Sequence, residues 1–401
     1  ATTTYGGGDI WVVKLDAAGD LVWQKNYGGS NQETGIRIIE TTAGDLMVVG
    51  ETASSDGDVV GHQGFFDMWV LRLAANGTLL WQHPLGSVSG SDIANAIVET
   101  ADGGFILTGN VGAGDGDVSG FQGGIYDIWL ARLDASGQLL WEESYGGSGN
   151  DQVGDVLLAS NGDLILVASS NSTDGDISGP IGSSDLWVIS VDSTGLLLWE
   201  KSYGGSNGDS GSRGYRAANG DLVVFGASSS SDVDVNANYG AQDAWLVRID
   251  NSGSILWEQN FGGTAMESNV RGFSSAPDGG YVFACTTASN NVDVSGNSGG
   301  QDLWVVKLAP DHTAIGDMDK GIPVMELWPN PACNVIHIVL EGVDAITLFS
   351  ATGSSVSLPS EAFKCSSSDR CTLDVRSLTP GAYVLHLESS SQPRAGRFVK
   401  E

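Results

Sequence analysis

The sequence has little positive charge, little proline, and few cysteine or histidine residues. Its 401 residues include 49 acidic and 18 basic side chains, a formal net charge of −31, with 10 prolines, 4 cysteines and 5 histidines. A field of this sign repels nucleic acid and anionic membranes, so nucleic acid is not expected as a partner. No apolar run reaches the roughly 18 residues of a membrane-spanning helix. Four cysteines are too few for a disulfide scaffold.

The sequence motifs of several enzyme classes are missing as well. There is no Gly-Lys dipeptide, which excludes a phosphate-binding P-loop, and no His-Glu-x-x-His or Cys-x-x-Cys metal motif. The histidines form no cluster from which a catalytic triad can be argued. The stretch from Gly208 to Gly211 is similar to a serine-protease nucleophile loop, but it occupies a slot that other repeats fill with ordinary loops. We therefore expect no catalytic or cofactor-binding residues, and a protein that is not an enzyme.

What the sequence does contain is a repeat of about 58 to 60 residues, rich in glycine (57 residues). The pattern Asp-x-Trp returns six times, and a second tryptophan follows twelve residues after each of the first five. A fixed period of this length indicates stacked supersecondary units that present the same surface many times. The pairs are Asp9/Trp11, Asp67/Trp69, Asp127/Trp129, Asp185/Trp187, Asp243/Trp245 and Asp302/Trp304, and the second tryptophans are Trp23, Trp81, Trp141, Trp199 and Trp257.

One repeat, residues 79–133, shows how its strands are arranged. Four short runs of strand-forming residues are separated by Gly- and Asp-rich turn signals, and no stretch has a sustained helical period. Four short antiparallel strands with large aromatic residues at fixed positions are typical of a propeller blade. We predict an all-β fold, a β-propeller of about five four-stranded blades followed by a small β-sandwich. A β-solenoid is the second choice, because its coils are usually far shorter.

The strand runs also predict where the blades begin and end. One further strand, 9–15, is left without a partner in this scheme. Either an upstream repeat has been lost, or this strand pairs with an open sheet edge in its own propeller or in a neighbouring molecule. Within a propeller domain of residues 1–308, the expected blades are about 20–73, 78–133, 138–191, 196–249 and 254–308.

The repeats resemble the bacterial β-propeller repeats of secreted proteins. The resemblance rests on a Tyr-Gly-Gly-Ser loop and on a hairpin containing glycine with Asn or Asp, and it covers roughly three quarters of the chain. It implies an architecture but no particular activity. The loops are Tyr27–Ser30, Tyr145–Ser148 and Tyr203–Ser206, with a relaxed version at Phe261–Thr264 and a departure at Leu85–Ser87.

The two residues of the Asp-x-Trp pattern are expected to have structural roles. The aspartate is expected to fix the start of a strand by accepting hydrogen bonds from nearby backbone N–H groups. The tryptophans are expected to fill the space between blades; an exposed position that stacks on carbohydrate is the alternative. The residues assigned to blade packing are Trp11, Trp69, Trp129, Trp187, Trp245 and Trp304.

Paired acids recur in five loops and are the candidate metal ligands. Alternating carboxylates on a tight loop can supply oxygen ligands to Ca²⁺. The favoured interpretation is that Asp and Gly build the turn through local hydrogen bonds, because the spacing lacks the further ligands of an EF-hand. The acids are Asp56 and Asp58, Asp115 and Asp117, Asp174 and Asp176, Asp232 and Asp234, and Asp293, which follows Asn291.

The repeat pattern stops at Leu308. Residues 309–321 have the composition of a polar linker, and short strand-like runs within 322–401 predict a small β-sandwich. Cys365 and Cys371 bracket a polar loop and are the candidate disulfide pair, which would fit an oxidising compartment. Cys285 lies in an apolar run and is expected to be a buried free thiol, while Cys333 has no predicted partner.

The C-terminal segment resembles the sorting domain of the type IX secretion system of Bacteroidetes. Trp328, in place of a common tyrosine, and Ser354, in place of a usual basic residue, depart from that pattern. The resemblance implies export to the cell surface or outside by secretion and attachment machinery, and in that family the domain is usually cut off after export. It rests on Leu327–Pro331, Leu348–Gly353, Leu378–Leu385 and Arg397–Lys400, with Pro329, Asn330, Pro331, Gly381, Tyr383 and Lys400 as its marker residues.

Three functions fit these features. The first is adhesion, or the binding of an extracellular glycan or protein, by a non-enzymatic propeller. The second is a structural subunit of an extracellular filament or surface assembly, which would use the spare N-terminal strand and a retained C-terminal domain. The third is a carbohydrate-active enzyme, placed last because the acids recur in register without a singular pair. An irregular, acid-lined central pocket would favour the enzyme.

Overall fold

The computed structural model describes residues 5–159, 161–217, 220–308, 334–339, 345–350, 355–356, 363–367, 370–379, 381–388 and 394–400. Contacts divide the chain into two units. One comprises residues up to Ser274 together with Val282–Val306, and the other comprises Ser275–Tyr281 and Lys307–Glu401. Within the described residues, every regular element is a β-strand. None of them forms a helix long and apolar enough to cross a bilayer.

The repeat region contains twenty-one strands, all paired in antiparallel fashion where their register is defined. Most are seven residues long, as the repeat period requires for four strands and their turns. The strands are β1 (Ile10–Leu15), β2 (Leu21–Tyr27), β3 (Glu33–Glu40), β4 (Leu46–Thr52), β5 (Asp67–Leu73), β6 (Leu79–Leu85), β7 (Ile93–Glu99), β8 (Phe105–Val111), β9 (Asp127–Leu133), β10 (Leu139–Tyr145), β11 (Asp151–Leu158), β12 (Leu164–Ser170), β13 (Asp185–Val191), β14 (Leu197–Tyr203), β15 (Asp209–Arg216), β16 (Leu222–Ser228), β17 (Asp243–Ile249), β18 (Ile255–Phe261), β19 (Glu267–Ser275), β20 (Tyr281–Thr287) and β21 (Asp302–Lys307).

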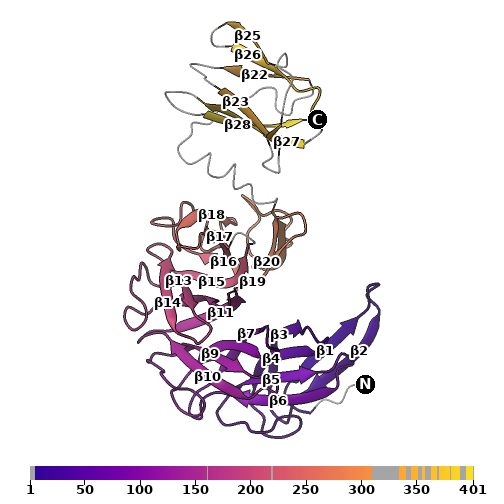
Figure 1. Cartoon of the computed structure of the whole chain (residues 1–401), viewed down its shortest axis with the longest axis vertical. Helices are drawn as coiled ribbons and strands as arrows, with labels where there is room; N and C mark the ends of the chain where they lie inside the picture. Colours follow the sequence, from indigo (N-terminus) through magenta and orange to yellow (C-terminus); the bar gives the residue numbers. More distant parts are fainter. Residues whose placement is uncertain are drawn as a thin grey trace. The chain divides into compact units, whose positions relative to one another are not determined.

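These strands form a five-bladed β-propeller, which confirms the predicted fold class. Four blades are complete sheets of four strands, β3–β6, β7–β10, β11–β14 and β15–β18, and the fifth blade has three strands, β19–β21. A two-stranded sheet, β1–β2, precedes the first blade. Neighbouring sheets follow one another in chain order (Figure 1).

The predicted blade boundaries differ from the observed sheets by one strand. The strand with the second tryptophan closes the sheet before it and does not open the next one: β6 pairs with β5, and β10 pairs with β9. A tight turn explains this pairing, because the amide of Ala74 donates to Thr78 and that of Gly77 donates back to Ala74. Strand β1 is therefore not unpaired, since β2 is its partner. The sequence alone did not distinguish the two groupings, because both connections are short.

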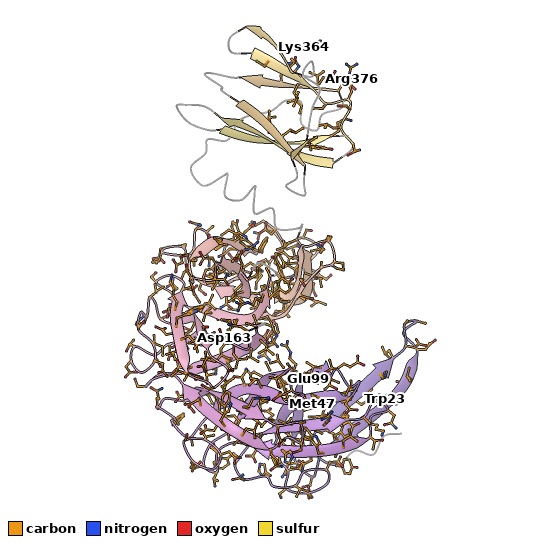
Figure 2. The ribbon with its side chains drawn as sticks, in the orientation of Figure 1. Trp23, Met47, Glu99, Asp163, Lys364 and Arg376 are labelled. Atoms are coloured by element: carbon orange, nitrogen blue, oxygen red, sulfur yellow. The ribbon has the colours of Figure 1, made fainter. Side chains whose placement is uncertain are left out.

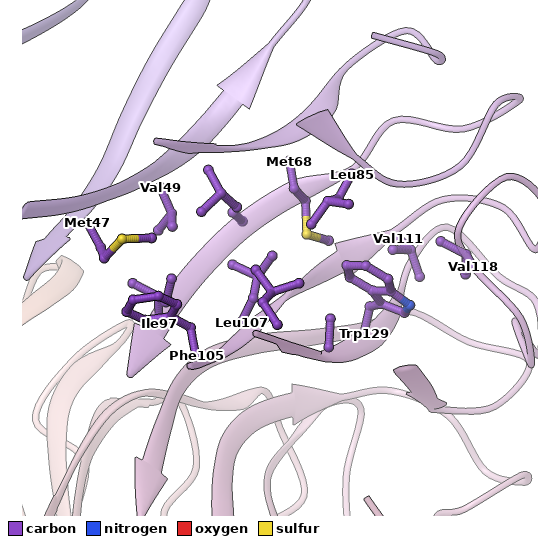
Figure 3. Close-up of a cluster of buried hydrophobic side chains, with 14 residues drawn as sticks. Met47, Val49, Met68, Leu85, Ile97, Phe105, Leu107, Val111, Val118 and Trp129 are labelled. Atoms are coloured by element: carbon purple, nitrogen blue, oxygen red, sulfur yellow. The ribbon is translucent and has the colours of Figure 1, made fainter. Parts of the chain in front are cut away.

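The core lies between successive blades. Met47, Val49 and Met68 of one blade and Phe105 and Trp129 of the next belong to a single buried cluster (Figure 3). Every residue of β9, β13 and β17 is buried. Because the third strand of a blade is covered by a sheet on each side, both of its faces are apolar.

The C-terminal unit contains two small antiparallel sheets, with strand orders β22-β26-β25 and β24-β23-β27-β28. Ile336, Leu348, Leu373 and Leu385 are among its buried side chains. The described part of this unit is all-β, as predicted. Its strands are β22 (Val335–Val339), β23 (Ala345–Ser350), β24 (Ser355–Val356), β25 (Phe363–Ser367), β26 (Arg370–Asp374), β27 (Gly381–Glu388) and β28 (Arg394–Lys400).

Candidate functional site

The first strand of each blade lines the centre of the propeller. Strand β7 contacts both β3 and β11, and β11 contacts β15, so the first strands of successive blades are neighbours. Each of these four strands also contains a bulge, where its register against the second strand of its blade shifts. A bulge leaves one residue unpaired and changes the direction of nearby side chains. The unpaired residues are Ile36, Asn95, Gly154 and Ser212.

A central pocket lies against these bulges. Its volume is about 250 Å³, and all five first strands from β3 to β19 contribute to its wall. The wall combines aliphatic, amide, hydroxyl and guanidinium groups, and none of its described residues is acidic. The side chains in the wall belong to Ile36, Ile93, Asn95, Asn110, Gln152, Val153, Ser169, Ser212, Arg213 and Arg271.

An ion pair supports one side of this pocket. Arg37 of β3 donates to Asp155 of β11 over 3.0 Å, although the two residues are 118 positions apart in the sequence. Asp155 also accepts the backbone N–H of Gly214, at 3.2 Å. Burial raises the pKa of the Asp155 carboxyl, while the charges of Arg37 and Arg213 act in the opposite direction. Asp155 thus links its own strand, β11, to the first strands β3 and β15.

The arginines outnumber the carboxylate. Arg213 donates to the carbonyls of Gly154 and, over 2.9 Å, of Ser212. Desolvation lowers the pKa of Arg213; Asp155 opposes this, and the like charges of Arg37 and Arg271 add to it. Within the described residues, Arg271 is exposed and forms no hydrogen bond or ion pair with a protein group. Arg213 thus lies between one carboxylate and two further guanidinium groups, and the centre is locally positive in a strongly acidic protein.

Hydrogen bonds hold the polar wall in place. The side-chain amide of Asn95 donates to the carbonyl of Val153, and Asn110 Oδ1 accepts the backbone N–H of Val153 over 2.9 Å. Both bonds connect the second blade to the third. Protein groups alone therefore fix the polar wall of the pocket.

Sequence reasoning missed this site, although a signal was present. Each first strand carries an acid at or next to its start, and the position four residues after that acid varies between repeats. A position that varies among otherwise similar repeats can carry a function that the repeats do not share. Three of the five residues at this position are arginine, which is scarce in this chain. The acids are Glu33, Asp92, Asp151, Asp209 and Glu267, and the variable slot holds Arg37, Ala96, Asp155, Arg213 and Arg271.

The paired acids, which were the candidate metal ligands, accept hydrogen bonds from backbone groups that are distant in the sequence. Asp174 Oδ1 accepts the N–H of Ser148 over 2.7 Å, and Asp176 Oδ2 accepts the N–H of Gly146 over 3.1 Å. The same clamp recurs from Asp56 and Asp58 to Ser30 and Gly28, from Asp115 and Asp117 to Val88 and Gly86, from Asp232 and Asp234 to Ser206 and Gly204, and from Asn291 and Asp293 to Thr264 and Gly262.

These contacts support a structural role for the paired acids. Each pair fastens the glycine-rich loop at the end of the fourth strand. The residue between the acids has a positive φ, which is 67° at Gly57 and, at less suitable residues, 58° at Val233 and 59° at Val292. Within the described residues, no group of three or more His, Cys, Asp or Glu side chains is arranged to hold a metal ion. Ca²⁺ binding by these loops stays a prediction that none of these contacts supports.

The aspartate of each Asp-x-Trp pattern accepts backbone hydrogen bonds just before its strand. Asp67, for example, accepts the N–H groups of Gln63 at 2.7 Å and Gly64 at 2.9 Å. Asp127 uses only one of its oxygens in this way; its buried Oδ1 has no hydrogen-bond partner among the described residues. Burial, followed by the charges of Asp151 and Asp176, raises the pKa of Asp127 to about 6. The carboxylates at each blade junction therefore repel one another at neutral pH.

The six tryptophans of the pattern do not share one environment. Trp69, Trp129, Trp187 and Trp245 are fully buried between blades, and Trp304 is partly buried. Trp11 departs from its predicted packing role, because 62% of its surface is exposed. The second tryptophan can link its own sheet to the next one. Trp23, labelled on β2 in Figure 2, donates to the carbonyl of Ala75 over 3.1 Å.

Several predicted residues of the C-terminal unit can be placed. Tyr383 is buried on β27, and its hydroxyl donates to the carbonyl of Thr379 over 2.9 Å. Gly381 begins β27 and pairs with Lys400 at the end of β28. Pro329, Asn330, Pro331 and Cys333 lie outside the described residues.

The cysteine predictions have different outcomes. Cys371 is disulfide-bonded, and Cys365 is the residue opposite it on the neighbouring strand. The side chain of Cys365 lies outside the described residues, so this pairing stays a prediction. Cys285 is a buried free thiol, and burial raises its pKa to about 12.

Comparison with protein families identifies the C-terminal unit. Residues 326–401 match the model described as "Secretion system C-terminal sorting domain". This segment is a type IX secretion system sorting domain. Its presence indicates export of the chain to the cell surface or outside. The sorting domain also implies that the type IX machinery handles the chain.

The propeller has distant structural relatives. A chimera of apocarotenoid oxygenase and RPE65 is 15% identical, with 71% of this chain and 65% of that chain covered and a TM-score of 0.37. The Trp149Ala mutant of the Synechocystis apocarotenoid oxygenase is 14% identical over the same shares, also with a TM-score of 0.37.

A GH43_1 enzyme from Xanthomonas citri, solved with xylose, is 13% identical, with 69% and 90% covered and a TM-score of 0.35. This chain thus spans slightly less than two thirds of the oxygenase chains. No curated protein sequence matches it. These likenesses are too remote to assign an activity.

Proposed function

We propose that this exported propeller is a non-enzymatic binding module that holds an acidic group of an extracellular ligand in its central pocket. The observation that carries the proposal is the excess of arginine at the pocket. Arg213 is close enough to Arg37, Arg271 and Asp155 to feel the charge of each, so three arginines meet a single carboxylate there. The repulsion among these arginines is relieved when an anion binds, so anion binding is favoured there.

The pocket chemistry suggests the class of ligand. A guanidinium group matches a planar carboxylate through two parallel hydrogen bonds. The amide of Gln152 and the hydroxyl of Ser212 stand in the same wall and suit the hydroxyl groups of a sugar ring. A volume of about 250 Å³ is below the usual range for drug-sized ligands and fits a single small unit. The favoured ligand is therefore a carboxylate-bearing sugar.

The same wall argues against the carbohydrate-active enzyme. Glycosidases of the common type need two carboxylic groups on opposite sides of the scissile bond. No acidic residue is in the described wall of the pocket, and Asp155 behind it is engaged by Arg37. An acid-lined pocket was the feature that would favour the enzyme, and the described wall is instead lined by arginine.

Calorimetric titration tests the proposal. Glucuronate is the probe, glucose is the neutral control, and both are titrated into the full chain at low salt. We expect glucuronate to bind and glucose to show no measurable heat. Affinity for glucuronate should fall at least tenfold in Arg271→Ala and recover in part in Arg271→Lys, because Lys keeps the charge but loses the planar fork.

A matched control separates the pocket from the general charge of the protein. Arg216 lies on the same strand as Arg213 but is not part of the pocket wall. Arg216→Ala removes the same charge and should leave glucuronate affinity unchanged. Equal binding of glucose and glucuronate, or an equal loss in Arg216→Ala and Arg271→Ala, contradicts the proposal.

A further inference from the structure

The two end strands of the propeller each lack half of their normal surroundings. In complete blades the third strand is buried on both faces, as in β13 and β17. In β1 and β21, which are the equivalent strands, burial alternates along the strand. The exposed fraction is 62% at Trp11 and 74% at Leu303, while Trp187 and Leu186, at the same slots of a complete blade, are 0% and 1% exposed.

The junctions between blades show what normally covers each face. On one side of a junction lie the first and third residues after the aspartate of the Asp-x-Trp pattern. On the other side stand the tryptophan and the residue two positions after it, from the next blade. The matched pairs are Ile10 and Val12 with Trp69 and Leu71, Met68 and Val70 with Trp129 and Ala131, Ile128 and Leu130 with Trp187 and Ile189, and Leu186 and Val188 with Trp245 and Val247.

The exposed faces at the two ends are the two halves of this junction. The Trp11 face, formed by Trp11, Val13 and Leu15 of β1, corresponds to the tryptophan half. The Leu303 face, formed by Leu303 and Val305 of β21, corresponds to the other half. These four junctions thus define the shape and chemistry that each end face accepts.

We propose that the Trp11 face of one copy of this chain packs against the Leu303 face of a second copy. Both faces belong to the same compact unit and are exposed within it. A second copy supplies the complementary half with the same packing that is seen at these four junctions. Because the joined faces differ, each added copy leaves one of each face free, and the association is head-to-tail.

The two end strands also have unpaired edges, which are separate from the apolar faces. Strand β1 pairs only with β2, and β21 pairs only with β20, so within the described strands each end strand has one unpaired edge. Unpaired edges of this kind favour association with another chain. The proposal does not depend on the central pocket.

Two single variants of the full chain test the proposal by analytical ultracentrifugation. The unmodified chain should show a mass that rises with concentration beyond one copy. Trp11→Glu and Leu303→Glu should each be a monomer at concentrations where the unmodified chain associates. Mixed one to one, the two variants should form a dimer and nothing larger, because the intact Leu303 face of the first meets the intact Trp11 face of the second.

A control variant and two outcomes make the test decisive. Phe65→Glu changes an equally apolar loop residue, 72% exposed, and should leave the association intact. A monomer at every concentration overturns the proposal, and so does association that both single variants retain. Circular dichroism of each variant shows that it is folded, so a loss of association can be assigned to the changed face.

Discussion

The third strands of the complete blades and the two end strands carry the same motif in different surroundings. Trp187 in β13 and Trp11 in β1 follow an aspartate by two residues, yet one is fully buried and the other is 62% exposed. Their indole nitrogens even make the same kind of bond, to Glu200 at 2.8 Å and to Gln24 at 3.1 Å. The comparison shows that the motif builds the sheet locally, while burial depends on a neighbouring blade.

The largest difference is expected when the tryptophan is removed. Trp187→Ala should lower the free energy of unfolding of the propeller by about 4 kcal/mol, because it leaves a large cavity between two blades. At concentrations where the chain is a monomer, Trp11→Ala should change it by less than about 0.5 kcal/mol, because no blade of the same chain covers that side chain. Urea denaturation followed by circular dichroism measures both values. Equal losses would show that Trp11 is buried in solution.

A recurring ion pair offers the second comparison. Arg248 of β17 is buried and binds Asp221 over 2.6 Å, whereas Lys307 of β21 binds Asp278 over 2.9 Å in an exposed pair. Arg248→Ala removes this charged partner from the buried Asp221 and should cost about 3 kcal/mol. Lys307→Ala should leave the unfolding midpoint within experimental error, because water screens that pair. A similar loss in the two variants would contradict the inferred difference in burial.

The smallest effect is expected from the carboxylates at the blade junctions. The pKa of Asp127 is raised to about 6 in the folded protein, above its ordinary value of 3.8, so the folded state takes up a proton as the pH falls through 6. Its contribution to stability therefore grows as the pH falls from 7 toward 4 and is lost as the pH rises through 6.

Asp127→Asn removes this pH dependence and the repulsion behind it. At pH 7 it should stabilise the propeller by about 1 kcal/mol, a figure reduced to allow for solvent screening. Thermal unfolding between pH 4.5 and 7.5 checks this. Asp302→Asn, on the end strand β21, is the matched control and should have a smaller effect, because Asp302 is only partly buried. A steeper pH profile in Asp127→Asn than in the unmodified chain would refute the explanation.

Local patterns predicted most of the fold. The segment Asp185–Val191 has apolar residues on both faces of the strand, which predicts a strand covered on each side. The predicted third strands are observed at the expected positions. The grouping of strands into blades was wrong by one strand, because the chain between Leu73 and Leu79 and that between Leu85 and Ile93 are both short turns by sequence. Only hydrogen bonding shows that the first turn joins strands of one sheet.

The candidate sites were less predictable than the strands. The paired acids at Asp174 and Asp176 suggested a local turn or a cation, but they bind the loop at Gly146–Ser148, more than 25 residues away. The arginines of the pocket were passed over because each is alone in its own stretch of sequence. Their common slot became meaningful only when the bulges placed them around one centre.

The sequence by itself determined the all-β class, the repeat, the strand segments and the export signal at residues 326–401. These features depend on residues a few positions apart, or on a motif contained in one segment. Only the tertiary structure decided which strands share a blade, which faces stay uncovered at Trp11 and Leu303, and that Arg37, Asp155 and Arg213 meet. Those outcomes depend on contacts between residues one or two whole repeats apart, and a periodic sequence does not specify which copy of a repeated surface another segment will contact.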